Sequence, residues 1–273
     1  MTFIETFYNK YNEDGRLKTP YGRVEYETTM HYIRKTIERI RAEKDAPGSP
    51  LRVLDIGCAA GVYAIPLMED GHDVTCVDPV NYHLGRLKQK AARKGLKART
   101  LKGQVPGLKL KDGEPFDLVL MLGPLYHLFT EEDKTAALRE GAGFLNGHGR
   151  LLAGYIMNEF AVLTYGMLDG HFLLSLRDGK LDRTFHVRNT EEDMFSFDRT
   201  EDIFRYTEQA GLTAETVFSQ DGPTNYFRQA VAALDEMTFR VYLDYHLAVC
   251  ERPDLIGAGC HTCTVLKKRP GPG

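Results

Sequence analysis

The stretch Val53–Gly61 reads VLDIGCAAG: an apolar run, then an acid, then a series of small residues. A short apolar run is typical of a buried strand. Small residues directly after a strand let the backbone turn into a helix and let a ligand approach the main chain closely. A tight turn without a ligand is the alternative. Features elsewhere in the chain are needed to distinguish a ligand-binding loop from such a turn.

Strand and helix patterns alternate on both sides of this stretch. Apolar runs predict strands at 51–56, 72–77, 97–102, 116–121 and 150–156, and helical periodicity lies between most of them. Thr200 to Ala210 then predicts a helix, followed by strands at 212–218 and 260–268 with a largely helical segment, 226–250, between them. Strands separated by helices at this spacing indicate a parallel sheet with right-handed crossovers, and therefore a doubly wound α/β fold.

Three local features refine this prediction. A helix from the mid-20s to about residue 42 precedes the first strand, and Thr130-Glu-Glu-Asp133 is typical of a capping box. Pro66 interrupts the helical face that begins at Ala60, so we expect a kink or a lost hydrogen bond there. Residues 157–196 have a weaker pattern and predict an insertion, part of it a hairpin around Asp178-Gly179.

Composition excludes several classes of protein. The 273 residues carry a net charge of −3, without the sustained basic excess of a nucleic-acid-binding surface. No apolar stretch is long enough to cross a bilayer, and the N-terminus is unlike a signal peptide. Five scattered cysteines favour a reduced, cytoplasmic protein. Cys260 and Cys263 form a single CxxC without a second ligand pair, which favours two ordinary thiols in a strand over zinc, so no metal is predicted.

A carboxylate at the end of the second predicted strand points to a nucleoside. Asp78 follows Gly57 by 21 residues, a position from which an acid can accept hydrogen bonds from both ribose hydroxyls. A helix-capping aspartate is the alternative. The dinucleotide pattern G-x-G-x-x-G fails at two of three positions, because Ala59 and Val62 stand where glycines belong.

The pattern G-x-G-x-G, with an acid two residues upstream, fits better through Asp55, Gly57, Ala59 and Gly61, and only Ala59 departs from it. In this motif the chain resembles the class I S-adenosylmethionine-dependent methyltransferases. Over roughly residues 20–268 it looks closest to a bacterial, small-molecule branch. Further stretches carry the resemblance: RLKTPYGRVEYETTMHYI (16–33), VTCVDPV, FDLVLMLGPLYHLFTEED (116–133), GRLLAGYI (149–156) and GAGCHTCTVLKKR (257–269).

The resemblance implies a Rossmann-like, seven-stranded, mostly parallel sheet and a set of donor-binding residues. Gly57 and the backbone around it would face the amino-acid end and the ribose of the donor. Asp55, just before the loop, would orient the donor, and Asp78 would take the ribose hydroxyls. Gln104 stands where the family usually places an acid for the adenine amino group, and Leu122 would offer its backbone beside the methionine part. The full predicted donor site comprises Asp55, Gly57, Cys58, Ala59, Gly61, Asp78, Pro79, Gln104, Val105 and Leu122.

The resemblance also implies a single methyltransferase domain over 1–273. Its parts are an N-terminal helical cap (1–48), a donor-binding half (49–156), an insertion (157–196) and the C-terminal part of the sheet (197–273). Tyr126 and His127 are the candidate catalytic groups on the acceptor side, although His127 could equally be a packing residue. On the cap, Tyr26 and His31 would fold over the pocket with Arg23, a candidate partner for the donor carboxylate. The insertion is the expected second wall of the acceptor pocket or a dimer contact.

The predicted function is transfer of a methyl group from S-adenosylmethionine to a small-molecule acceptor, with S-adenosylhomocysteine as product. Two alternatives stay open. One is a nicotinamide-dependent oxidoreductase, and the other is a donor-binding protein without catalysis. Nucleic acid is an unlikely acceptor, because GPLY stands where an Asn/Asp-Pro-Pro-aromatic motif would follow the fourth strand. A homodimer is possible, and neither a metal nor a membrane is expected.

Overall fold

A computed structural model describes residues 13–110, 113 and 115–269 of the chain. Seven strands form one sheet in the order β3-β2-β1-β4-β5-β7-β6. Strands β1 to β5 run parallel to one another, and β7 runs antiparallel to both of its neighbours. The strands are β1 (Arg52–Ile56), β2 (Asp73–Asp78), β3 (Arg99–Lys102), β4 (Phe116–Met121), β5 (Leu145–Ile156), β6 (Leu212–Ser219) and β7 (His261–Lys268).

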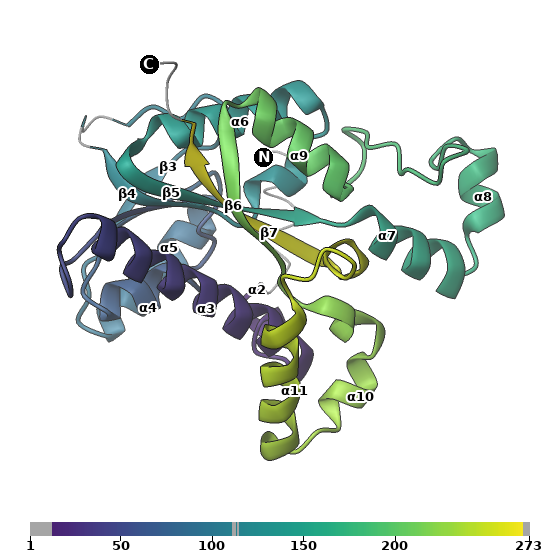
Figure 1. Ribbon diagram of the computed structural model, residues 1–273, viewed down its shortest axis with the longest axis horizontal. Coiled ribbons are helices and arrows are strands. Elements are labelled where there is room, and N and C mark those ends of the chain that lie inside the picture. Colours follow the sequence, from purple (N-terminus) through teal and green to yellow (C-terminus); the bar gives the residue numbers. More distant parts are fainter. Residues whose placement is uncertain (1–12, 111–112, 114, 270–273) are drawn as a thin grey trace.

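Helices cover both faces of this sheet (Figure 1). One face carries α3 (Pro20–Glu43), α4 (Ala64–Glu69) and α5 (Asn81–Arg93), and the other carries α6 (Glu131–Gly143) and α9 (Thr200–Gln209). Figure 1 also shows α7 (Asn158–Ala161) and α8 (Phe172–Arg177) projecting from the sheet on one side, and α10 (Arg228–Ala232) with α11 (Glu236–Val249) below it. The remaining elements are α2 (Glu13–Arg16), the 3-10 helices η1 (Pro124–His127), η3 (Gly222–Tyr226) and η4 (Ile256–Ala258), and the π-helical η2 (Val162–Leu168).

Alternate residues of the central strands build the two halves of the core. Leu118 and Leu120 of β4 pack with α3 residues such as Ile33 on one face, whereas Val119 and Met121 pack with the α6 and α9 side on the other. Because parallel strands are buried on both faces, they are apolar throughout, as the sequence FDLVLM at 116–121 shows. The predicted doubly wound, mostly parallel seven-stranded sheet is confirmed.

Two local predictions were wrong in part. Helix α4 begins at Ala64 rather than Ala60, so Pro66 lies in its first turn. The N–H groups of Ile65 and Leu67 on either side bond to the carbonyl oxygens of Gly61 and Tyr63, and Pro66 has no N–H for the bond between them, as predicted. The insertion contains the helices α7, η2 and α8 in its first half, and Asp178 is the C-cap residue of α8, whereas an antiparallel bridge joins Leu181 to Val187, beyond Asp178-Gly179. A glycine after a helix serves as a C-terminal cap as readily as a hairpin turn, which explains the second error.

The division of the chain into cap, donor-binding half, insertion and C-terminal part stays a prediction, and residues 1–12 of the cap lie outside the described residues. None of the helices that the structure describes combines the length and the apolar character needed to span a membrane.

Candidate functional site

A pocket opens where β1, β2 and β4 end at their carboxyl edge, beside the turn η1. In an open α/β sheet this edge, at the point where the strand order reverses, is where ligands bind. The order β3-β2-β1-β4 reverses between β1 and β4, so the pocket lies at that point. Of the predicted site residues, the pocket is lined by Asp55, Gly57, Cys58, Ala59, Asp78, Pro79, Gln104, Val105, Leu122, Tyr126 and His127.

The backbone of the glycine loop takes the conformations that its small residues allow. Gly57, Ala59 and Gly61 all have positive φ, at 77°, 45° and 84°. A side chain on Gly57 would place its Cβ 2.9 Å from the ring of Pro124, so this position needs glycine for space as well as for conformation. Gly61 differs from its neighbours, because it packs against Leu87 of α5 and Ile65 of α4 and does not line the pocket.

Asp78 faces the pocket and fastens the loop at the same time. One carboxylate oxygen, Oδ2, accepts a hydrogen bond from the Ala59 N–H at 2.9 Å. The other, Oδ1, accepts from the Val80 N–H at 2.8 Å and lies 3.1 Å from Nδ1 of His83. A carboxylate has about four acceptor positions, so part of its capacity is left for a ligand.

Asp55 is the most unusual group in the pocket. Its side chain is buried at 2% exposure, and Oδ2 has no hydrogen-bond partner among the described residues. Burial, with a smaller contribution from the charge of Asp78, raises the pKa of Asp55 to about 7. A buried carboxyl group without a partner is destabilising, so its presence at a pocket wall indicates a ligand group that completes its bonding.

Cys58 is a packing residue in the loop. The neighbouring Cys76 and burial raise the pKa of the Cys58 thiol well above its usual range. A thiol that stays protonated is a poor nucleophile, which agrees with the interpretation from the sequence.

Two polar side chains stand at the end of the pocket formed by η1. His127 Nδ1 lies 3.0 Å from the carbonyl oxygen of Met194, and because a carbonyl can only accept, Nδ1 carries the proton and Nε2 is the basic nitrogen of the neutral ring. Burial lowers the pKa of His127, which keeps the ring neutral near pH 7. Burial raises the pKa of the nearby Tyr126 hydroxyl well above its usual range, with a further contribution from Glu25.

The N-terminal segment closes this end with residues that the sequence analysis did not select. Arg16, Leu17 and Glu25 line the pocket, and Arg16 pairs with Glu25 through two hydrogen bonds of 2.5 and 2.9 Å. The described side chain of Arg23 lies outside the lining: it pairs with Glu27 and Glu236, at 3.0 and 2.9 Å. The spacing between Arg16 and Glu25, on either side of the helix start at Pro20, was the sequence signal that could have revealed the pair.

Behind Glu25 lies a second cluster that the sequence did not predict. His261 Nδ1 is 2.7 Å from Oδ2 of Asp221 and 3.5 Å from Oε2 of Glu25. Burial disfavours the charged ring, but Cys260, Glu25 and Asp221 raise the pKa of His261 well above its usual range. His261 therefore places a positive charge between two carboxylates that are far apart in the sequence.

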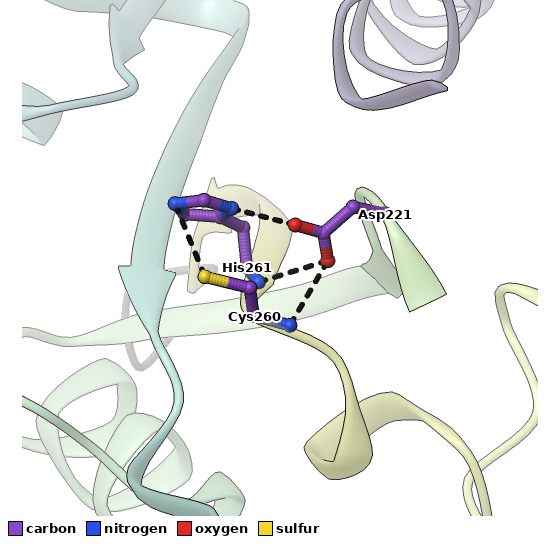
Figure 2. Close-up of side chains that lie close together, drawn as sticks. All are labelled: Asp221, Cys260 and His261. Atoms are coloured by element: carbon purple, nitrogen blue, oxygen red, sulfur yellow. Dashed lines mark hydrogen bonds and ion pairs between the residues drawn. The ribbon is translucent and has the colours of Figure 1, made fainter. Parts of the chain in front are cut away.

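Asp221, Cys260 and His261 are also close enough to resemble a metal site (Figure 2). Figure 2 shows the Asp221 carboxylate bonded to the His261 ring and to the backbone N–H groups of Cys260 and His261. Asn225 donates a fourth hydrogen bond to the same carboxylate. Since these four bonds occupy its acceptor positions, the arrangement is that of a hydrogen-bonded cluster.

The other cap residues lie away from the lining. Tyr26 stacks on Tyr63, a pocket residue, with 5.9 Å between the ring centroids, and His31 is exposed. In the insertion, Ser196 donates a backbone hydrogen bond of 2.7 Å to Tyr126, and the Phe195 ring lies 5.5 Å from His127. The end of the insertion therefore contacts the pocket residues, whereas Tyr165 and Phe185 are exposed.

Fold and geometry together place a pocket with a glycine loop and two buried acids at the switch point of a doubly wound α/β sheet. Comparison with known proteins supports a methyltransferase domain in this part of the chain. Residues 53–149 match the family model described as "Methyltransferase domain". The chain thus carries a class I, S-adenosylmethionine-dependent methyltransferase domain, as the sequence motif predicted.

Individual relatives are more distant. The ubiquinone biosynthesis O-methyltransferase of Methylobacterium nodulans is 26% identical over 185 residues, 67% of this chain and 69% of that protein. The Rickettsia akari protein of the same name is 27% identical over 99 residues, 36% of this chain, so the chain spans only 38% of that relative's length. A crystal structure of magnesium protoporphyrin IX methyltransferase from Synechocystis with bound S-adenosylhomocysteine has a TM-score of 0.58 at 15% identity, covering 95% of this chain and 89% of that one. The last likeness shows the fold.

Proposed function

We propose that this protein transfers a methyl group from S-adenosylmethionine to a small-molecule acceptor and releases S-adenosylhomocysteine. The observation that carries the proposal is the buried Asp55 carboxyl group, whose Oδ2 has no partner among the described residues and which lines a pocket together with a glycine loop and Asp78. A donor with an ammonium group and a ribose would supply the missing partners.

Each part of the donor has a candidate contact. The ribose hydroxyls would bond to Asp78, whose carboxylate retains acceptor capacity, and the main chain at Gly57 and Leu122 would lie beside the methionine part. Gln104 and Val105 would contact the adenine, with the Gln104 amide in place of the usual acid. Cys58, Ala59 and Pro79 would pack against the donor. Gly61 supports the loop from behind.

For the acceptor we propose a hydroxyl-bearing small molecule, with His127 as general base and Tyr126 as a group that orients the acceptor. As the acceptor oxygen attacks the methyl carbon, its proton passes to Nε2 of His127, and the carbon–sulfur bond breaks to leave a neutral thioether. The relatives named O-methyltransferases support a hydroxyl acceptor. The rest of the catalysis is alignment and exclusion of water.

Titration calorimetry with S-adenosylhomocysteine and with NAD tests the donor. We expect binding of the former and none of the latter; the reverse would favour a nicotinamide-dependent oxidoreductase, which the methyltransferase-domain match does not favour. Incubation with methyl-labelled S-adenosylmethionine and a panel of phenols, catechols and amines then tests turnover. Tight donor binding without label transfer to any acceptor would instead support a binding protein without catalysis.

We further propose a cytoplasmic protein, in which the cysteines Cys58, Cys76, Cys250, Cys260 and Cys263 stay reduced, as they are in the structure. The exposed apolar residues of the insertion, among them Leu173 and Leu168, support a possible homodimer contact. Sedimentation of the purified protein tests the second point. A nucleic-acid acceptor stays unlikely on the net charge of −3.

A further inference from the structure

Arg16 and Glu25 form a two-pronged ion pair on the wall of the pocket. The two guanidinium nitrogens lie 2.5 and 2.9 Å from the two carboxylate oxygens. The Glu25 side chain is 5% exposed and that of Arg16 is 26% exposed. This geometry is the strongest form of recognition between a guanidinium group and a carboxylate.

The proposed donor carries a carboxylate of the same shape. Among the described residues that line the pocket, Arg16 is the one lysine or arginine. Arg16 lies near η1, where the methionine end of the donor would bind. Tyr126 of η1 is close enough to Arg16 and Glu25 for their charges to affect its pKa, and Gly57 of the glycine loop lies against Pro124 of the same turn. Glu25 and the donor carboxylate would therefore compete for one guanidinium group.

Glu25 can release Arg16 without losing every positive partner. His261 lies 3.5 Å from Oε2 of Glu25 and is held in place by Asp221 at 2.7 Å. Removing all partners from a buried carboxylate would be severely destabilising, whereas leaving it beside a charged imidazole is not. The structure thus provides a second cation beside Oε2 of Glu25, the same oxygen that Arg16 Nη1 contacts.

We propose that Arg16 exchanges Glu25 for the α-carboxylate of the donor, so that Glu25 is the partner of Arg16 in the empty site and a competitor of the donor. This inference rests on the proposed function. After the exchange, Glu25 stays on the pocket wall as a carboxylate paired with His261. Because Glu25 competes with the donor for Arg16, its charge is unfavourable for donor binding although it lines the donor's pocket.

Calorimetry with two probes tests the exchange. S-adenosylhomocysteine has the carboxylate, and 5′-methylthioadenosine lacks the amino-acid group. We expect Arg16→Gln to weaken binding of the first by about tenfold or more and to leave the second within about threefold. We expect Glu25→Gln to tighten binding of S-adenosylhomocysteine by about threefold or more, again without effect on 5′-methylthioadenosine. Glu27→Gln, two residues along α3 and paired with Arg23, is the matched control and should change neither affinity.

The outcomes separate the exchange from the proposed function. If the wild-type protein binds neither probe, the proposed function fails. If the wild type binds both probes but Glu25→Gln leaves the affinity for S-adenosylhomocysteine unchanged, or weakens that affinity alone, the exchange is wrong. In the first case Glu25 has no effect on donor binding, and in the second it contacts the donor. If Glu25→Gln also fails to bind 5′-methylthioadenosine because the variant does not fold, the result for Arg16→Gln is used instead. If Arg16→Gln changes the affinities for both probes equally, or changes neither, the exchange is overturned.

Discussion

The carboxylate of Asp78 at the end of β2 accepts a hydrogen bond of 2.9 Å from the backbone N–H of Ala59 in the glycine loop after β1. The acid that is proposed to hold the ribose therefore also holds the loop in position. Ala59 has a φ of 45°, a conformation that costs an L-residue about 1 kcal/mol, and this bond helps to maintain it. The two halves of the donor site are consequently not independent.

Asp78→Ala should weaken S-adenosylhomocysteine binding by at least about 1.5 kcal/mol, or roughly tenfold, because it removes a charged acceptor from the ligand and a support from the loop. Calorimetry measures this loss. Asp73→Ala, at the exposed start of the same strand, is the matched control and should leave the affinity unchanged. Equal affinities of wild type and Asp78→Ala would contradict the ribose assignment.

Gly57→Val should abolish detectable binding of the same ligand while the protein still folds. The new side chain meets the ring of Pro124 and stands in the pocket, at a φ of 77° that valine adopts only under strain. Gly71→Val is the control that separates backbone strain from obstruction of the pocket. Gly71 also has a positive φ, of 88°, but no atom lies within 4 Å of an added Cβ. Both variants should lose stability, but only Gly57→Val should lose the ligand. Retained affinity would mean that the loop does not touch the donor.

Binding of S-adenosylhomocysteine should strengthen between pH 5.5 and 7.5. The pKa of Asp55 is raised to about 7, so the group is protonated at the lower pH and ionised at the higher one, where it attracts the ligand's ammonium group. If only the ionised form binds, the affinity should rise by about tenfold or more. Calorimetry at several pH values measures the change, and Asp55→Asn should remove most of it. A steep dependence that persists in Asp55→Asn would assign the titration to another group.

The same pKa shift predicts a cost in stability. A carboxyl group whose pKa is raised on folding holds its proton more tightly in the folded state, so the free energy of unfolding should fall as the pH rises from about 4 to about 7. Asp55→Asn removes this contribution. In urea titrations at pH 7 the variant should therefore be at least as stable as the wild type, and a less stable variant would show that the ionised carboxylate is favourably bonded.

Local sequence patterns identified the part of the site that comes from adjacent βα units. Asp55, Gly57 and Asp78 lie at the ends of neighbouring strands. The strand pattern, the small residues and the spacing between them were therefore sufficient to predict that they lie close together. The contact between Glu25 and His261 was beyond this reasoning, because it joins α3 to the last strand, β7, and depends on packing. The arginines show the difficulty: the sequence analysis named Arg23, near the start of α3, whereas the fold places Arg16, just before that helix, at the pocket.

A buried ion pair was another feature that sequence could not reveal. Lys134 of α6 and Asp198 are 1% and 2% exposed, with Nζ 2.6 Å from both carboxylate oxygens. In the sequence, Lys134 looks like part of a polar first turn. Tyr206 of α9 donates a further bond of 3.1 Å to Asp198, so the pair links the two helices on one face of the sheet.

Lys134→Met should lower the free energy of unfolding by about 3–5 kcal/mol, because it leaves the Asp198 charge buried without its partner. Urea denaturation measures the loss. The exposed pair of Lys94 with Glu69 has the same 2.6 Å distance, and Lys94→Met should cost no more than about 1 kcal/mol. Adding Asp198→Asn to Lys134→Met should recover part of the stability. Similar losses for the two lysines would show that burial does not determine the contribution of the pair.

His127→Asn tests the proposed base directly. The asparagine amide can still donate to the Met194 carbonyl as Nδ1 does, but it offers no basic nitrogen in place of Nε2. We expect the rate of methyl transfer to a hydroxyl acceptor to fall by about 10²–10⁴-fold, while binding of S-adenosylhomocysteine is unchanged. Because burial lowers the pKa of His127, the wild-type rate at saturating donor should stay constant down to a pH below 6.5 and then decrease, and the variant should lack that decrease. His148→Asn, an exposed histidine, is the control. A rate unaffected by His127→Asn would show that the acceptor loses its proton without this side chain.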